Sequence, residues 1–378
     1  MRRTGKGLIG GALLAAVSGL GLSLYSSRLA RHAEDLVPPD GRFLDVDGAR
    51  LHYIDVGSQT GPTIVMVHGL GGQLRNFSYA LVDLLKDEYR VIVVDRPGSG
   101  YSVATGNTTP GIIAQGAIIA DFIQKLGLDR PLFVGHSLGG AIGLAVGLDH
   151  PHLVRALALI APLTQPLEQV PESFRGLARI PAGARLAFAQ VLGTPLSRLT
   201  ATRTLQGVFA PEAVPEDFVT RGGGALAARP IAIAAAAADL AGANDDVTAM
   251  AARYGEIQLP TRILYGRQDA ILDPAWNGHR TAAAIAGAKI DTIEGGHMIP
   301  ITAPEACARF VRAAVAAGGG GRRPSSLSTP AKAGAQLGKV ANGAWPQSRR
   351  PFQLGPGLRR GGASVGSAYT TTGVCGAV

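Results

Sequence analysis

The chain has 378 residues, of which 46% are hydrophobic, and this is enough material for a core of domain size. Its two cysteines exclude a disulfide framework and a multi-cysteine zinc site. The formal net charge of +9 would fit a nucleic-acid partner, but residues 318–378 carry eight basic residues and no acidic one. Residues 1–317 are therefore near neutral, and we expect no binding to nucleic acid.

The amino terminus is basic (Arg2, Arg3 and Lys6), and the 18 residues Leu8–Tyr25 carry no charge. As a helix this run is about 27 Å long, just enough to cross a bilayer. No convincing small-x-small cleavage site follows it. We therefore expect residues 1–40 to be an uncleaved single-pass anchor and linker, with the rest of the chain facing outward. A cleaved signal, giving a secreted or periplasmic protein, and a peripheral segment are the alternatives.

Strand and helix patterns alternate after this segment. Residues 42–56 alternate between apolar and polar around Asp47-Gly48, which predicts a β-hairpin. Apolar runs predict strands that are covered on both faces; these are Thr63–Val67, Val91–Val94, Leu132–Gly135 and Ala156–Ile160. Two further strands are expected at Arg262–Tyr265 and Ala288–Thr292. Helical patterns occupy Phe77–Lys86, Ile112–Leu126, Gly139–Asp149 and Pro304–Ala317. The alternation predicts an α/β fold with a mostly parallel, doubly wound sheet.

The alternation is interrupted once. Residues 163–246 are rich in Ala, Leu and Pro and predict several short helices, which we expect to form a cap over the carboxyl edge of the sheet. The core of the fold then has two parts, 41–162 and 247–317. Residues 318–378 are rich in Gly, Pro, Ser and Arg and are expected to be a disordered basic tail. The large apolar cap residues are candidates for a pocket lining or for the cap's own core: Phe174, Leu177, Ile180, Leu186, Phe188, Val191 and Leu192.

One short pattern points to chemistry. Gly135-His136-Ser137-Leu138-Gly139 is G-x-S-x-G between a predicted strand and a predicted helix. A strand that turns at once into a helix puts the middle residue in a strained conformation, and the flanking glycines let strand and helix approach without a Cβ clash. The Ser137 hydroxyl is then exposed at the carboxyl edge of the sheet as a candidate nucleophile. A glycine-rich turn with a serine N-cap is the alternative.

A serine nucleophile needs a base, and a carboxylate must hold that base in one tautomer. In this architecture each partner lies in a loop after a later strand. Asp269 directly follows a predicted strand, and His297 lies between the last predicted strand and the closing helix. Asp273 is a competing acid further from the strand end. We therefore expect a catalytic triad of Ser137, Asp269 and His297. No cluster of His, Asp and Glu has metal-ligand spacing, and no cofactor is expected.

Attack on a carbonyl also requires backbone amides that stabilise the negative oxygen. One donor is expected at Leu138, the residue after the nucleophile. The other is expected at Leu70, in the loop His68-Gly69-Leu70-Gly71-Gly72 after the strand Thr63–Val67. The three glycines of that loop allow its backbone to approach a substrate.

Five short motifs occur in the order typical of the α/β-hydrolase superfamily: His68–Gly72, Asp95–Ser102, Gly135–Gly140, Gly266-x-x-Asp269 and Gly296-His297. Over about residues 41–315 the chain resembles that superfamily, and most of all its serine-esterase branch, which includes monoacylglycerol lipase-like enzymes and carboxylesterases. The resemblance implies the α/β-hydrolase fold. Haloalkane dehalogenases and epoxide hydrolases share the Asp95 motif but use an aspartate nucleophile where this chain has Ser137.

These features together predict a serine hydrolase that cleaves carboxylic esters through an acyl-enzyme. The apolar cap residues and the expected membrane anchor favour a lipophilic acyl substrate. Carbon–carbon bond hydrolysis of a diketone and haloperoxidase-like perhydrolysis are alternatives with the same triad. A non-catalytic binding module is the least favoured interpretation, because all three triad residues are present.

Overall fold

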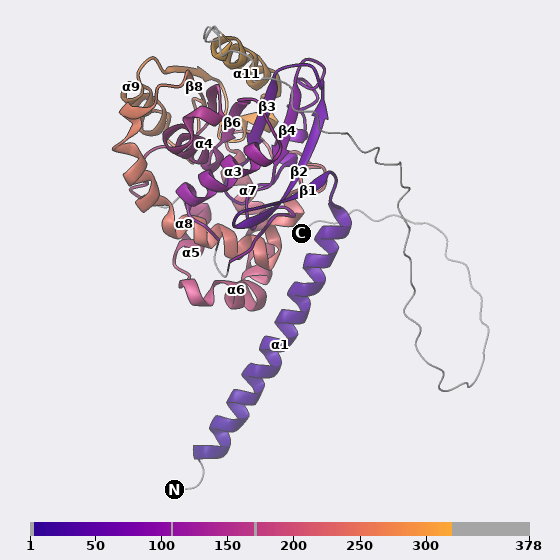
Figure 1. Ribbon diagram of the computed structural model, residues 1–378. Helices are drawn as coiled ribbons and strands as arrows, with labels where there is room; N and C mark the ends of the chain where they lie inside the picture. Colours follow the sequence, from indigo (N-terminus) through magenta and orange to yellow (C-terminus); the bar gives the residue numbers. More distant parts are fainter. Residues whose placement is uncertain (1–3, 107–108, 170–171, 320–378) are drawn as a thin grey trace, which may run out of the picture. The chain divides into compact units, whose positions relative to one another are not determined.

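The computed structural model describes residues 4–106, 109–169 and 172–319, and of residues 4–15, 173 and 178 only the backbone. The predicted tail lies outside these ranges from residue 320 on. In the described residues, nine strands form one sheet (Figure 1). The strands are β1 (Arg42–Val46), β2 (Ala49–Gly57), β3 (Thr63–Val67), β4 (Arg90–Val94), β5 (Val103–Ala104), β6 (Leu132–His136), β7 (Ala156–Ile160), β8 (Thr261–Gly266) and β9 (Lys289–Ile293).

Helices precede, separate and follow these strands. The longer ones are α1 (Thr4–Leu36), α3 (Ile112–Lys125), α4 (Leu138–Asp149), α7 (Thr194–Phe209), α8 (Pro230–Ala251) and α11 (Pro304–Gly318). The short ones are α2 (Arg75–Ser78), η1 (Pro151–Leu153), η2 (Glu172–Phe174), α5 (Arg175–Ala178), η3 (Ala182–Ala184), α6 (Arg185–Phe188), η4 (Ala189–Gly193), η5 (Gly224–Ala228), η6 (Tyr254–Glu256), η7 (Pro274–His279), α9 (Arg280–Ala284) and α10 (Ile299–Thr302).

The sheet is parallel except at one edge. Its strand order is β1-β2-β4-β3-β6-β7-β8-β9, with β5 paired to β2. The predicted hairpin is confirmed, since β1 and β2 are antiparallel with Val46 opposite Ala49. From β4 to β9 all neighbouring strands are parallel. The predicted α/β fold with a mostly parallel sheet is therefore confirmed.

Both faces of the sheet are covered. On β3, Val65 and Val67 pack in one apolar cluster with α3 and α4, whereas Ile64 and Met66 pack in a second cluster with residues 77–89 and α11. All four side chains are fully buried. Burial on both faces is the reason why this strand is a continuous apolar run in the sequence.

One predicted helix is much shorter than expected. The pattern over Phe77–Lys86 predicted a helix, but α2 ends at Ser78 and turns follow it. The amide of Val82 donates to the carbonyl of Phe77, five residues back, and that of Leu85 donates to Val82, three residues back. This mixed spacing interrupts an α-helix. The apolar side chains of the segment nevertheless reach the core, which explains why the pattern looked helical.

The insertion between β7 and β8 is helical, as expected. Its last α-helix, α8, runs to Ala251, beyond the cap boundary predicted at residue 246. The side chains of Ala243, Val247 and Met250 belong to the apolar core beside α4. The division of the chain into a core and a cap remains a prediction.

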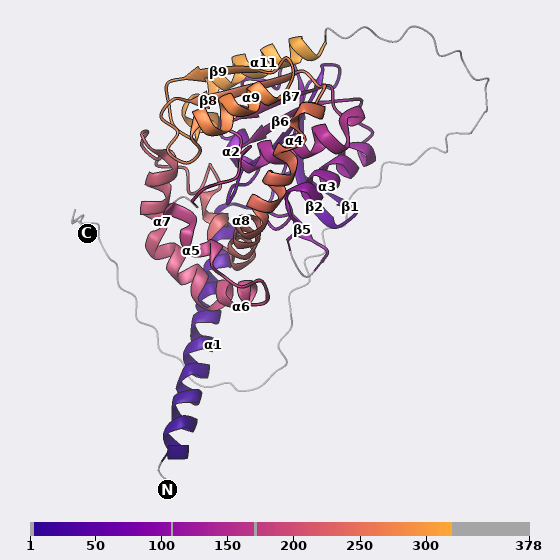
Figure 2. The ribbon, with the colours of Figure 1, turned by 90° about the vertical axis from the view of Figure 1, so that its left-hand side faces the viewer.

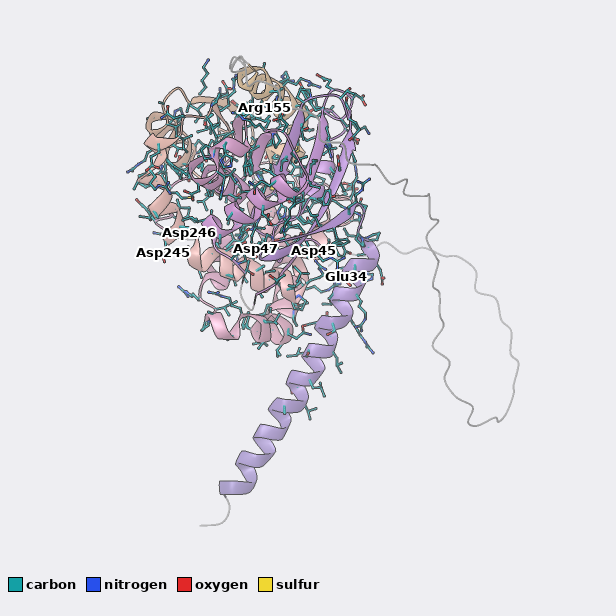
Figure 3. The ribbon with its side chains drawn as sticks, viewed as in Figure 1. Glu34, Asp45, Asp47, Arg155, Asp245 and Asp246 are labelled. Atoms are coloured by element: carbon teal, nitrogen blue, oxygen red, sulfur yellow. The ribbon has the colours of Figure 1, made fainter. Side chains whose placement is uncertain are left out.

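The amino-terminal helix α1 contacts the cap. It packs against η4 and α7, and Figure 2 shows α7 beside it. The side-chain amide of Gln190 donates to the carbonyl of Ser23 and to the hydroxyl of Ser27, at 3.0 Å each. Glu34, on the last turn of α1 and labelled in Figure 3, pairs with Arg229 at 2.9 Å. The residues predicted as a linker after Tyr25 are therefore largely helical and docked.

The expected membrane anchor finds no support in this helix. Among the residues that the structure describes, no helix is long and apolar enough to cross a membrane. Residues 8–15 of the predicted span Leu8–Tyr25 are among those described by their backbone alone. Near the end of the predicted span, Ser23 accepts a hydrogen bond from Gln190, as does Ser27 just beyond it, so one side of this helix packs on protein.

Candidate active site

Ser137 occupies a strained turn between β6 and α4. Its backbone has φ 55° and ψ −121°, a conformation that residues other than glycine rarely adopt. A Cβ on Gly135 would lie 2.3 Å from the carbonyl oxygen of Gly139, and a Cβ on Gly139 would lie 2.1 Å from that of Val67. The close approach of strand and helix at the predicted turn thus requires glycine at both positions.

His297 lies between Ser137 and Asp269. Its Nε2 is 3.0 Å from the Ser137 Oγ, and its Nδ1 is 2.8 Å from Asp269 Oδ2. With the Nδ1 proton donated to the carboxylate, Nε2 is free to accept the serine proton. All three residues are buried. The structure therefore brings together the three predicted site residues, which come from loops after β6, β8 and β9.

The two competing carboxylates have different partners. One oxygen of Asp269 accepts from the amides of Ile271 and Leu272 at 2.9 Å each, and the other faces His297. Asp273 instead caps η7, where its carboxylate accepts from the amide of Ala275 at 2.8 Å. Asp269 thus contacts the His297 ring, as predicted for the acid of the triad, whereas Asp273 caps the start of η7.

The residue before the nucleophile has a structural contact. His136 Nε2 lies 3.0 Å from the carbonyl oxygen of His297, to which it can donate a proton. Burial, and then the proximity of His297, lower the pKa of His136 to about 3. His136 therefore stays neutral and supports the backbone of the histidine loop. The sequence pattern did not predict this contact.

The predicted oxyanion loop lies directly against Ser137. A Cβ on Gly69 would lie 2.8 Å from the Ser137 Cβ, and Leu70 and Leu138 line the same pocket as Ser137. Leu138 is the first residue of α4, where helix amides lack an intrahelical acceptor. Neither of the two leucine amides donates a backbone hydrogen bond within the described part of the chain. Both are free to donate to a substrate oxygen.

Arg96 holds this loop from behind. Its guanidinium is fully buried and donates to the carbonyls of His68 at 3.1 Å and Gly69 at 3.0 Å. It also pairs at 2.9 Å with Asp239 of α8, which is equally buried. Arg96 belongs to the motif Asp95–Ser102, which in the sequence supported only the resemblance to the α/β-hydrolase superfamily. Nothing in the sequence signalled its partner Asp239, which is 143 residues away.

A pocket of about 1260 Å³ opens above Ser137 and His297. Its walls are mostly apolar side chains of the cap, of the core and, unexpectedly, of α1. The cap contributes Phe174, Leu177 and Phe188, as the sequence analysis proposed, together with Leu196, Leu205 and Phe209, and α1 contributes Leu29, His32, Ala33 and Leu36.

The remaining apolar cap residues of the sequence analysis do not line this pocket. Ile180 is buried, whereas Leu186 and Leu192 are exposed to solvent, and Val191 is half-buried. The sequence showed that these residues are apolar, but their direction depends on how the short helices pack.

Comparison with protein families agrees with this geometry. The model of the alpha/beta hydrolase fold family matches residues 62–304, which is more than half of the chain. The chain therefore belongs to the alpha/beta hydrolase family, and the fold and family that its motifs predicted are confirmed.

Individual relatives match less of the chain. It is 33% identical over 163 residues to the dihydrolipoyllysine-residue acetyltransferase component of the acetoin cleaving system of Cupriavidus necator, a region that is 42% of each protein. The chain thus spans about two fifths of the length of the first curated relatives it matches.

Two solved structures are similar in fold. An enol-lactonase from Burkholderia xenovorans LB400 has a TM-score of 0.61 at 22% identity, and the match covers 73% of this chain and 100% of that one. A membrane phospholipase A, described as a bacterial virulence factor, has a TM-score of 0.56 at 22% identity, with 84% and 99% covered. At these identities the two structures show the fold alone.

Proposed function

We propose that this hydrolase cleaves carboxylic esters with Ser137 as its nucleophile and prefers lipophilic acyl groups. The observation that carries the proposal is the position of His297, within hydrogen-bond distance of both the Ser137 hydroxyl and the Asp269 carboxylate. This is the arrangement in which a histidine activates a serine for acyl transfer.

In the proposed reaction the Ser137 Oγ attacks the acyl carbon while His297 Nε2 takes the hydroxyl proton. The carbonyl oxygen becomes negative and accepts from the amides of Leu70 and Leu138. The tetrahedral intermediate collapses, His297 returns the proton to the leaving alcohol, and an acyl-enzyme remains. Water, deprotonated by the same nitrogen, then releases the carboxylic acid and regenerates the serine.

The preference for a lipophilic acyl group is supported by the pocket. Its volume of about 1260 Å³ and its lining of Leu and Phe side chains suit a long aliphatic chain better than a charged one. Ser137, in place of an aspartate, weighs against dehalogenation.

The test is hydrolysis of p-nitrophenyl esters from acetate to palmitate by the full chain. We expect turnover of medium and long esters and a loss of roughly 10³-fold or more in kcat in Ser137→Ala. Ser58→Ala, which removes a hydroxyl outside the pocket lining, is the matched control and should be unchanged. Near-normal turnover by folded Ser137→Ala would remove the mechanism. Cleavage of a diketone without ester hydrolysis would favour carbon–carbon hydrolysis instead.

A further inference from the structure

Large apolar side chains are exposed mainly on one part of the molecule. Among the described residues, thirteen large apolar side chains are exposed, and eleven of them belong to α1 or to the insertion between β7 and β8. Only Phe43 and Val103 are exposed elsewhere. Single exposed apolar residues are ordinary on a soluble protein, but a concentration of them on neighbouring elements marks an interaction surface.

Six of these side chains form two stripes, which we call the apolar face. On α1, Val17, Leu20 and Leu24 are spaced by three and four residues and so lie on one side of the helix. The second stripe runs from η4 into α7, and its residues are spaced by four and then three positions: Leu192, Leu196 and Leu199. Leu199 is 82% exposed and Leu20 is 63% exposed.

The two stripes belong to elements that contact each other. Helix α1 packs against both η4 and α7, and the hydrogen bonds from Gln190 to Ser23 and Ser27 hold them together. The same elements form a wall of the active-site pocket, through Leu196 on α7 and Leu29 on α1. The apolar face therefore borders the cavity that contains Ser137.

The charge around the apolar face is mostly positive, although Arg203 of α7 pairs with Glu172 at 2.6 Å and the exposed Asp35 lies on the last turn of α1. Residues 173–210, which include α6, η4 and α7, contain five arginines and no acidic residue. On α1 the stripe continues at helical spacing into the exposed Arg28 and Arg31. Two copies of such a cationic surface would repel each other. An anionic lipid surface offers both the apolar interior and the negative headgroups that would complement it.

We propose that the apolar face docks on an anionic lipid bilayer, with α1 and α7 lying in the headgroup region rather than crossing the membrane. Leucines would enter the acyl boundary while the arginines contact headgroups. An acyl chain would then pass from the bilayer into the pocket without crossing water. The role of this docking in substrate supply rests on the proposed function, but the docking itself does not.

The experiment is sedimentation of the full chain with vesicles of phosphatidylcholine, with and without phosphatidylglycerol. We expect binding to the anionic vesicles that weakens as salt is added. The double variant Leu20→Asp/Leu199→Asp, at positions outside the pocket lining, should lower the partition coefficient at least about tenfold. Phe43→Asp/Val103→Asp removes two apolar residues elsewhere, which are 42% and 47% exposed, and should bind as the unsubstituted protein does. Arg28→Gln/Arg31→Gln should weaken binding to anionic vesicles roughly tenfold.

Thermal unfolding of each variant checks that it is folded. Absence of binding by the unsubstituted protein, or equal losses in the two aspartate variants, would overturn the proposal. So would a dimer in solution that Leu20→Asp/Leu199→Asp dissociates, because the face would then be covered by a second copy. Ser137→Ala should bind vesicles normally, so failure of the proposed catalysis and failure of the docking are separate results.

Discussion

The carboxyl edge of the sheet and the surface formed by α1 with the cap are built in opposite ways. At the sheet edge, Gly135 and Gly139 admit backbone contacts that no side chain would allow, and Ser137 is held with a positive φ. On α1 and the cap, by contrast, large apolar side chains face solvent. Tight packing suits a region that must place reacting atoms to within a fraction of an ångström. An exposed apolar surface suits a region that selects and admits a substrate.

Arg96 connects the two regions. It donates to the oxyanion loop with one part of its guanidinium and pairs with Asp239 of α8 with another. Removing one partner of a buried pair leaves an uncompensated charge, whereas the intact pair holds both elements in one arrangement. The insertion between β7 and β8 is thus joined to the loop His68–Gly72 through a buried ion pair, and buried hydrogen bonds from Gln73 and Asn76 to the carbonyl of Gly222 add to this contact.

Because the sheet edge places the reacting atoms, we predict that substitutions there change the rate of the chemical step. Asp269→Asn should lower kcat by roughly 10²- to 10⁴-fold, because the histidine loses the carboxylate that fixes its tautomer. Asp273→Asn is the matched control, since that side chain caps η7, and it should change kcat little. Steady-state kinetics on one short soluble ester would decide between them. A larger loss in Asp273→Asn would identify the wrong carboxylate.

Substitutions in the α1 wall should change substrate choice instead. Leu29 lines the pocket, so Leu29→Trp should reduce kcat/KM for a ten-carbon ester roughly tenfold relative to a four-carbon ester. Tyr25→Trp, on an exposed position of the same helix outside the lining, should leave this ratio unchanged. The measurement is the ratio of kcat/KM for the ten-carbon ester to that for the four-carbon ester, at ester concentrations below the critical micelle concentration. Equal ratios in Leu29→Trp and the unsubstituted protein would show that α1 does not select the length of the acyl chain.

The smallest effect is expected from the basic tail. Residues 320–378 have no periodic apolar pattern, and α11 already ends at Gly318. Deleting them should leave the melting temperature and short-ester hydrolysis unchanged. A clear decrease in either would mean that part of the tail packs on the folded region and stabilises it.

Much of the sheet and its edge could be predicted because the signals are local. A buried parallel strand must be apolar along its length, and the sharp turn at Ser137 requires glycines two residues away on each side. The loops that carry Asp269 and His297 follow strands directly, and parallel strands end at the same edge of a sheet. The positions of these residues were therefore predictable, and their catalytic roles remain the proposal made above.

Only the tertiary structure decided the features that depend on distant segments. The apolar spacing over Phe77–Lys86 is compatible with a helix, but the backbone there forms turns whose side chains still reach the core. A charge-free run such as Leu8–Tyr25 indicates apolar character and length, yet Ser23 within it and Ser27 just after it accept hydrogen bonds from Gln190. Arg96 meets Asp239, and Leu29 meets the pocket, only after folding. Local sequence determines which backbone forms are allowed, whereas contacts between remote segments follow from which surfaces pack together.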